Sequence, residues 1–380
     1  MDAKPRAARR AREYSACARE CAILAGKIDR AAMKPSARKS PACKFWRPAA
    51  SALLLAFGMA GAANAVDLTV YTAVETEDLK RYAAALNRDH PDINIKWVRG
   101  TTGVITSRLL AERNSRRADV VWGLAATSLL ALKSAGITLP YRPAGIANLD
   151  PKFYDRASPP NWVGMNARVS AVCYNTAEGK KLELRAPRSW KDLTRPAYEG
   201  LIAMPNPVSS AAGYLDVSAW IQMFGETAGW DYMDALHENI ARYTDSGSQP
   251  CTLVASGELP IGISHAHHAA RLKTRGAAIE VIIPSEFAGW EVDAAAIVRG
   301  TGKLEAAKRL LDWAVSGRAM RVYNQTNAIV ASKGAARPVR NFPPEARSKL
   351  IENDFEFAAK NRARILEKWK SLFDPEPKEE

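Results

Sequence analysis

The sequence has few of the short motifs that identify an enzyme. Its 380 residues include no G-x-S-x-G nucleophile segment, no H-E-x-x-H pair and no Walker A loop. One D-S-G triplet occurs at residues 245–247, whereas aspartic-protease chemistry needs two such triplets facing each other. Ser264 and His265 are neighbours in the chain, but a nucleophile and its base are recognised by geometry and not by adjacency. We therefore expect no catalytic activity and no cofactor.

Positive charge is in excess, but mainly at one end of the chain. The formal net charge is +14, from 54 Lys and Arg residues against 40 Asp and Glu residues. Residues 1–65 hold 13 of the basic residues and four of the acidic ones, which leaves 41 against 36 in the rest. A nucleic-acid-binding domain carries its basic residues on the folded part. The charge therefore indicates no nucleic-acid partner.

Long hydrophobic runs are scarce as well. An apolar run of about a dozen residues, 49–60, follows a basic segment at 33–48 and leads to A-N-A at 63–65. This order is typical of a secretory signal, and the run is too short to cross a bilayer. We expect cleavage after Ala65, so that residues 1–65 are an upstream extension plus signal peptide, with Met33 as the candidate initiator. We expect residues 374–380 to be a disordered tail.

Cysteine is also rare. Of five cysteines, only Cys173 and Cys251 follow the expected cleavage point. Cys17 and Cys21 have the spacing of half a metal or redox site, but no second pair of ligands accompanies them. An even pair in an exported protein favours one disulfide between Cys173 and Cys251, and two buried thiols are the alternative.

The mature chain alternates between strand and helix patterns. Alternating apolar residues predict strands at 67–72, 93–98 and 119–122, each followed by a polar turn and a helical pattern. The same rhythm returns at 201–205 and 258–264. It predicts an α/β fold of two doubly wound lobes, whose ligands lie beyond the carboxyl ends of the strands. Further strands are expected at 278–284 and 292–298, and helices at 75–87, 303–316 and 344–372.

Two such lobes facing each other enclose a cleft, and the loops expected there are rich in hydroxyl groups. Helix N-termini present unpaired backbone N–H groups, which bind anions even without an arginine. A Ser or Thr at a helix start is also an ordinary N-cap, so each residue alone is a weak signal. Because both halves contribute such loops, we predict capture of a small anion. The candidate ligand-binding residues are Tyr71, Thr72, Thr101, Thr102, Gly103, Trp122, Ala125, Ala126, Thr127, Asn206, Ser209, Ser210 and Ala211.

Three of the five histidines, His265, His267 and His268, lie within four positions. A zinc site needs three or four convergent ligands, and only two of these histidines can share a face, with Glu291 and Asp293 as the other candidates. The alternatives are a wall of the ligand cleft and a solvated helix start. We favour a cleft wall formed by His265 or His268, and no metal. If a charged histidine holds the anion, affinity falls between about pH 6 and 8.

Longer stretches of the chain resemble the periplasmic solute-binding proteins of ABC importers, in the group with the two-lobed fold of ferric-ion, sulfate and spermidine carriers. Within that group the chain is most similar to 2-aminoethylphosphonate-binding proteins. The stretches that carry the resemblance are V-Y-T-A-V-E at 70–75, A-D-V-V-W-G-L-A-A-T-S at 118–128, M-P-N-P-V-S-S at 204–210, L-D-V-S-A-W-I-Q-M-F-G at 215–225 and Y-T-D-S-G-S-Q-P-C at 243–251.

The resemblance implies a type II periplasmic binding protein fold, with two lobes joined by hinge strands. Residues 66–168 and 291–340 would form lobe 1, and residues 169–290 and 341–373 would form lobe 2. The lobes would close on a small phosphonate, and a monomer in the periplasm would deliver it to a membrane permease and its ATPase. Both Cys173 and Cys251 lie in matching stretches, which supports the disulfide.

A zwitterionic aminophosphonate also needs a carboxylate for its ammonium group. Glu291 is the preferred candidate and Glu75 the alternative, with Trp122 or Trp290 as an apolar wall. The resemblance implies an acidic residue after the strand at 258–264, where this chain has Ala266. The exact ligand therefore stays open, and the alternatives are another small anion, a metal ion held by His265 and His268, or a sensory role.

Overall fold

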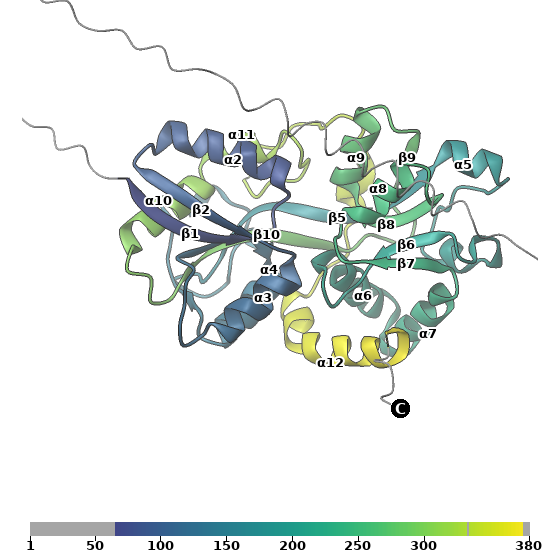
Figure 1. Cartoon of the computed structure of the whole chain (residues 1–380), viewed down its shortest axis with the longest axis horizontal. Helices are drawn as coiled ribbons and strands as arrows, with labels where there is room; N and C mark the ends of the chain where they lie inside the picture. Colours follow the sequence, from purple (N-terminus) through teal and green to yellow (C-terminus); the bar gives the residue numbers. More distant parts are fainter. Residues whose placement is uncertain (1–64, 333, 375–380) are drawn as a thin grey trace, which may run out of the picture. The chain divides into compact units, whose positions relative to one another are not determined.

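The computed structural model describes residues 65–332 and 334–374 (Figure 1). The predicted signal peptide up to residue 64 and residues 375–380 of the predicted tail lie outside the described residues. Within the described ranges, no helix combines the length and the hydrophobicity that crossing a membrane requires.

The first three strands form a parallel sheet in the order β2-β1-β3. Apolar residues such as Leu68 and Val70 alternate along β1 and are fully buried, which is why this segment is a strand. Each strand leads into a helix, as the sequence predicts. The elements are β1 (Val66–Thr72), α2 (Thr76–Asp89), β2 (Ile93–Arg99), α3 (Thr102–Ala111), β3 (Val120–Ala125), α4 (Ala126–Ser134) and the short β4 (Thr138–Leu139).

A second set of strand–helix units follows. Strand β6 pairs in parallel with both β7 and β8, and helices connect the three strands. The elements are α5 (Thr176–Lys181), β6 (Ile202–Pro205), α6 (Ala211–Phe224), α7 (Glu226–His237), β7 (Ile240–Thr244), α8 (Gln249–Ala255), β8 (Ile261–His265), α9 (Ala266–Thr274) and β9 (Ile279–Ile282).

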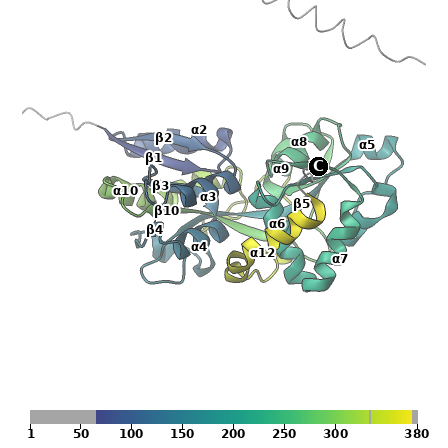
Figure 2. The same ribbon diagram turned by 60° about the horizontal axis from the view of Figure 1, so that its bottom comes forward.

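Two long strands run between these sets, β5 (Val163–Asn175) and β10 (Trp290–Val298). The first part of β5 pairs antiparallel with β10, and its second part pairs antiparallel with β8 and β9. Figures 1 and 2 show both strands in the middle of the molecule, between the two groups of helices. The sheet is therefore mixed, and the predicted two-lobed fold with hinge strands is confirmed.

The remaining elements are helical. They are η1 (Ile146–Asn148), η2 (Pro151–Phe153), η3 (Lys191–Thr194), η4 (Pro196–Tyr198), α10 (Leu304–Ala314), α11 (Gly317–Tyr323), η5 (Pro344–Lys349) and α12 (Phe355–Phe373). The single helix expected at 344–372 is thus two, because Asp354 caps a new helix by accepting from the backbone N–H of Phe357 at 2.9 Å.

Two hydrophobic cores lie on either side of the hinge. One contains Leu68, Trp122 and Trp313, and the other contains Trp220 and the α12 side chain Trp369. We call the parts around them lobe 1 and lobe 2; their predicted residue boundaries stay a prediction. A smaller third core surrounds the predicted disulfide between Cys173 and Cys251, whose Cα atoms are 5.6 Å apart, so that prediction is confirmed.

Candidate ligand-binding site

The two lobes meet where their strands end, and a small cavity lies between them. Loops after β1 and β2 of lobe 1 and after β6, β7 and β8 of lobe 2 form it, together with the middle of β5. We call it the cleft cavity; its lining residues are Ala73, Glu75, Arg99, Gly100, Thr101, Thr102, Arg168, Ser210, Ala211, Ala212, Ser246, Gly247, Ser248 and His265.

The lobes touch directly beside the cleft cavity. The backbone N–H of Gly103 donates to the carbonyl of Ser209 at 3.2 Å, and the Ser248 hydroxyl donates to Glu75 at 2.9 Å. A Cβ atom on Gly103 would lie 2.5 Å from the carbonyl oxygen of Val208. The cavity holds about 30 Å³, close to the volume of one water molecule. The lobes are thus closed, and a larger ligand enters only when they separate.

Arg168 is the one arginine on the hinge strands that lines the cleft cavity. Its Nε donates to the Asp293 carboxylate at 2.7 Å, and its terminal nitrogens have no partner among the described residues. Burial alone would lower the pKa of Arg168, but the adjacent Asp293 carboxylate more than offsets this and raises it. Arg168 therefore presents a fixed positive charge to the cavity.

His265 lines the same cavity, whereas His268 does not. His265 ends β8, and its Nδ1 has no hydrogen-bond partner within the described ranges. Its ring stacks on that of His267, with the centroids 5.4 Å apart. His268 Nε2 instead lies 3.1 Å from the Thr252 hydroxyl, and its Nδ1 lies 3.0 Å from a terminal nitrogen of Arg271.

The three histidines are buried, and this decides their charge. Burial, and next the charge of Arg168, holds the pKa of His265 well below its usual value. Burial, and next the charge of Arg271, lowers the pKa of His268 to about 4. Both rings are therefore neutral at pH 7. Neither histidine supplies the positive charge that pH-dependent binding of an anion would require. In the described part of the chain, no group of three or more His, Cys, Asp or Glu side chains is placed to hold a metal ion.

Six of the predicted site residues line the cleft cavity: Glu75, Thr101, Thr102, Ser210, Ala211 and His265. Gly103 and Ser209 form the contact between the lobes described above. Sequence reasoning missed the segment 246–248, where the backbone of Gly247 approaches closely: a Cβ there would lie 3.2 Å from both His265 Nε2 and Ser210 Oγ. Arg168 was also missed, although it is the only charged residue between Val163 and Asn175.

Other predicted residues lie away from the cleft cavity. Trp122 packs in the core of lobe 1 against Trp97 and Trp313, and the Trp290 indole N–H donates to the Ile351 carbonyl at 3.0 Å. Neither indole is a wall of this cavity, because each lies on a sheet face that is covered by other aromatic or aliphatic groups. Seven further predicted residues do not line the cleft cavity: Tyr71, Thr72, Ala125, Ala126, Thr127, Asn206 and Glu291.

The carboxylates proposed for an ammonium group already have partners. Glu75 accepts from Arg99 at 2.6 Å and from Ser248 at 2.9 Å. Glu291 accepts from the Thr127 hydroxyl at 2.5 Å and from the backbone N–H of Val292 at 2.8 Å. Burial raises the pKa of Glu291 to about 7. Glu75 thus lines the cleft cavity as a paired carboxylate, whereas Glu291 does not line it.

The sequence over residues 116–359 matches a family described as bacterial extracellular solute-binding protein. The chain belongs to this family. The members of this family are solute-binding proteins that act outside the cytoplasm.

Known proteins with similar sequences agree. A Sinorhizobium fredii protein named as an ABC transporter periplasmic-binding protein is 28% identical, over 60% of this chain and 64% of its own. A Salmonella typhimurium protein named for periplasmic 2-aminoethylphosphonate binding is 25% identical, over 60% and 66%. The structure of the periplasmic binding protein AfuA from Actinobacillus pleuropneumoniae, with exogenous fructose 6-phosphate bound, is 27% identical, with a TM-score of 0.77 over 82% of this chain and 99% of AfuA.

Proposed function

We propose that this protein captures a small organic phosphate or phosphonate in the periplasm and delivers it to an ABC importer. The observation that carries the proposal is the Arg168 guanidinium, whose terminal nitrogens have no partner within the described residues and which lines the cleft cavity. An arginine of this kind binds the oxygens of a phosphoryl group through two parallel hydrogen bonds.

The helices around the cleft cavity support an anionic ligand. Thr102 and Ala211 begin α3 and α6, so the positive ends of these two helices, one from each lobe, point at the same space. The Thr101 hydroxyl beside them is buried with no partner in the described chain. A phosphoryl group placed here would satisfy donors from both lobes, which favours the closed form.

The polar partners favour a phosphate ester of an uncharged molecule over an aminophosphonate. Glu75 and Glu291 are both engaged, and Ala266 is fully buried and has no acidic group. The neutral His265 imidazole can donate to or accept from a hydroxyl group. The fructose 6-phosphate bound to AfuA has this combination of phosphate and hydroxyls. 2-Aminoethylphosphonate stays the second candidate, because a relative is named for it.

Calorimetry on the protein purified from the periplasm tests the proposal. We expect fructose 6-phosphate to bind and unphosphorylated fructose not to bind, since the phosphoryl group supplies the charge that Arg168 pairs with. Inorganic phosphate should bind more weakly than the ester, and 2-aminoethylphosphonate more weakly than an amine-free alkylphosphonate. Equal binding of fructose and its phosphate would contradict the proposal, as would binding of Zn²⁺ with none of the phosphoryl ligands.

A further inference from the structure

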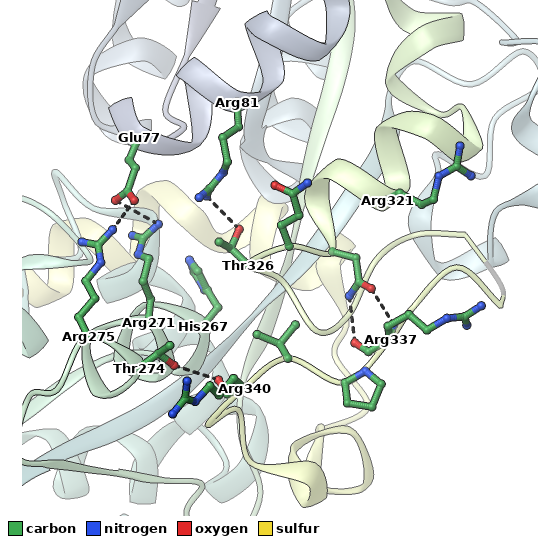
Figure 3. Close-up of a pocket in the computed structure, with 14 residues that line it drawn as sticks. Glu77, Arg81, His267, Arg271, Thr274, Arg275, Arg321, Thr326, Arg337 and Arg340 are labelled. Atoms are coloured by element: carbon green, nitrogen blue, oxygen red, sulfur yellow. Dashed lines mark hydrogen bonds and ion pairs between the residues drawn. The ribbon is translucent and has the colours of Figure 1, made fainter.

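A second and larger cavity lies where α2 of lobe 1 meets α9 of lobe 2. It holds about 420 Å³ and shares no lining residue with the cleft cavity. We call it the arginine pocket; Figure 3 shows its residues, which are Glu77, Arg81, His267, Arg271, Thr274, Arg275, Arg321, Asn324, Gln325, Thr326, Arg337, Pro338, Val339 and Arg340.

Positive charge dominates the arginine pocket. Six arginines line it, and the only carboxylate on its wall is Glu77. Glu77 pairs with Arg275, while the neighbouring Asp78 pairs with Arg81 and, at 3.2 Å, with Arg271. The arginines thus outnumber the two carboxylates.

The remaining arginines have no carboxylate. Within the described residues Arg321 and Arg340 have no ion pair, and the Arg337 guanidinium donates only to backbone carbonyls. In Figure 3 the guanidinium groups of Arg321 and Arg337 point away from the α2–α9 side of the pocket, so they add charge at its rim.

Three residues that line the pocket hold buried nitrogen atoms without hydrogen-bond partners among the described residues. Nε of Arg81, Nε of Arg271 and Nδ1 of His267 are all buried, and none has a hydrogen-bond partner among the described residues. The His267 residue is 7% exposed and the Arg271 side chain 11% exposed. A buried polar nitrogen that stays unpaired costs about 1–3 kcal/mol, so three such nitrogens in residues around one cavity favour a ligand that supplies partners.

We propose that the arginine pocket is a second binding site, for a multivalent oxyanion such as sulfate or pyrophosphate. Such an anion would accept hydrogen bonds from Arg81 on α2 and from Arg271 and His267 on α9. Guanidinium groups bind tetrahedral oxyanions through paired N–H donors, and the volume exceeds that of a single sulfate. A neutral or cationic ligand would leave the excess positive charge unbalanced.

An anion bound here would bridge the two lobes. Arg81 belongs to lobe 1, and Arg271 and His267 belong to lobe 2, so binding stabilises the closed arrangement of α2 and α9. This coupling, which rests on the proposed function of the cleft, predicts that saturating sulfate tightens binding of fructose 6-phosphate several-fold. Binding of an anion in the arginine pocket does not itself depend on the function proposed for the cleft cavity.

Calorimetry with pyrophosphate in a phosphate-free, low-salt buffer tests the site. We expect Arg81→Gln to weaken binding at least tenfold, because a central donor is lost. Arg340→Gln, whose exposed side chain has no side-chain partner in the described part of the chain, should weaken it several-fold without affecting folding. Arg156→Gln, an exposed arginine outside the pocket, is the matched control and should change nothing.

Two results would overturn the second site. Equal weakening by Arg156→Gln and Arg81→Gln would show general attraction to a basic surface. Loss of pyrophosphate binding in Arg168→Gln with retention in Arg81→Gln would place the anion in the cleft cavity, which would leave the proposed function intact. If instead pyrophosphate binding survives in Arg168→Gln while fructose 6-phosphate never binds, the second site stands and the proposed function fails.

Discussion

Arg168 combines two tasks in one side chain. Its Nε donates to Asp293, and the residue also lines the cleft cavity. We predict that Arg168→Lys keeps the ion pair with Asp293 but weakens fructose 6-phosphate binding by about tenfold or more, because lysine loses the paired hydrogen bonds that a guanidinium makes. Titration calorimetry measures this, with Arg156→Lys as the matched control. Unchanged affinity in Arg168→Lys would remove Arg168 from the site.

Glu291 predicts how the free energy of unfolding depends on pH. Burial raises the pKa of Glu291 from 4.5 to about 7, so the folded protein binds this proton more tightly than the unfolded chain does. The stabilisation is complete below pH 4.5 and is lost as the pH rises through 7. We expect the free energy of unfolding of the wild type, relative to Glu291→Gln, to fall by up to about 3 kcal/mol over that window.

Urea unfolding of both proteins at several pH values measures this difference. A glutamine carbonyl can still accept from Val292, and its amide group can donate to the Thr127 hydroxyl. Other buried acids such as Asp216 titrate equally in the two proteins, so their effects cancel. A difference that does not change with pH would show that Glu291 is charged in the folded protein. Binding of 2-aminoethylphosphonate by the same variant tests the ammonium role predicted from the sequence, and we expect no loss.

At the scale of elements, Gly103 near the start of α3 lets the two lobes meet. Its backbone lies against the carbonyl groups of Val208 and Ser209, so any side chain obstructs closure. We predict that Gly103→Gln weakens ligand binding at least about tenfold, because the closed form is strained by a bulky group. The unfolding free energy should change by less than about 0.5 kcal/mol, since the three atoms nearest a built Cβ all belong to lobe 2 and move away when the lobes separate.

The matched control for this change is Gly302→Gln. Gly302 has no atom within 4 Å of a built Cβ, and it lies outside the lobe contact. Binding by Gly302→Gln should equal that of the wild type. Tight binding by Gly103→Gln would contradict a role for this contact in closure.

Periodicity predicted most elements, and the misses have physical causes. The alternation at 67–72 and 93–98 gave strands that match β1 and β2 closely, because alternate residues are the more buried ones over at least part of each strand. The short apolar run at 201–205 matches β6, which is buried throughout. Strand β5 was not predicted: it is buried on both sides along most of its length, so its residues do not alternate.

The candidate site was predicted only in part from the sequence. Loops that directly follow a strand, at 101–102 and 210–211, could be placed at the cleft from the sequence, since strand ends meet at one edge. The contacts between the lobes could not be predicted from the sequence, because they depend on how closely two separately folded parts approach. Trp122 and Trp290 were misplaced because a sequence does not say on which face of a strand an indole packs.

At the scale of the whole molecule, ion pairs across the lobes favour the closed form. Arg275 of lobe 2 pairs with Glu77 of lobe 1, both more than 40% exposed, while the Arg271–Asp78 pair is mostly buried. Salt screens exposed pairs more than buried ones. We predict that the radius of gyration of the unliganded protein rises with sodium chloride concentration, and rises less in Glu77→Gln. Small-angle X-ray scattering that shows no dependence on salt would contradict this.

The central claim is that the cleft cavity between the lobes holds a phosphoryl group. The most direct test is a crystal structure of the protein grown with fructose 6-phosphate. We predict phosphate density within hydrogen-bond distance of Arg168 and of the N-termini of α3 and α6, with both lobes in contact with the ligand. Density for the phosphate in the arginine pocket, with the cleft cavity closed and empty, would contradict the account.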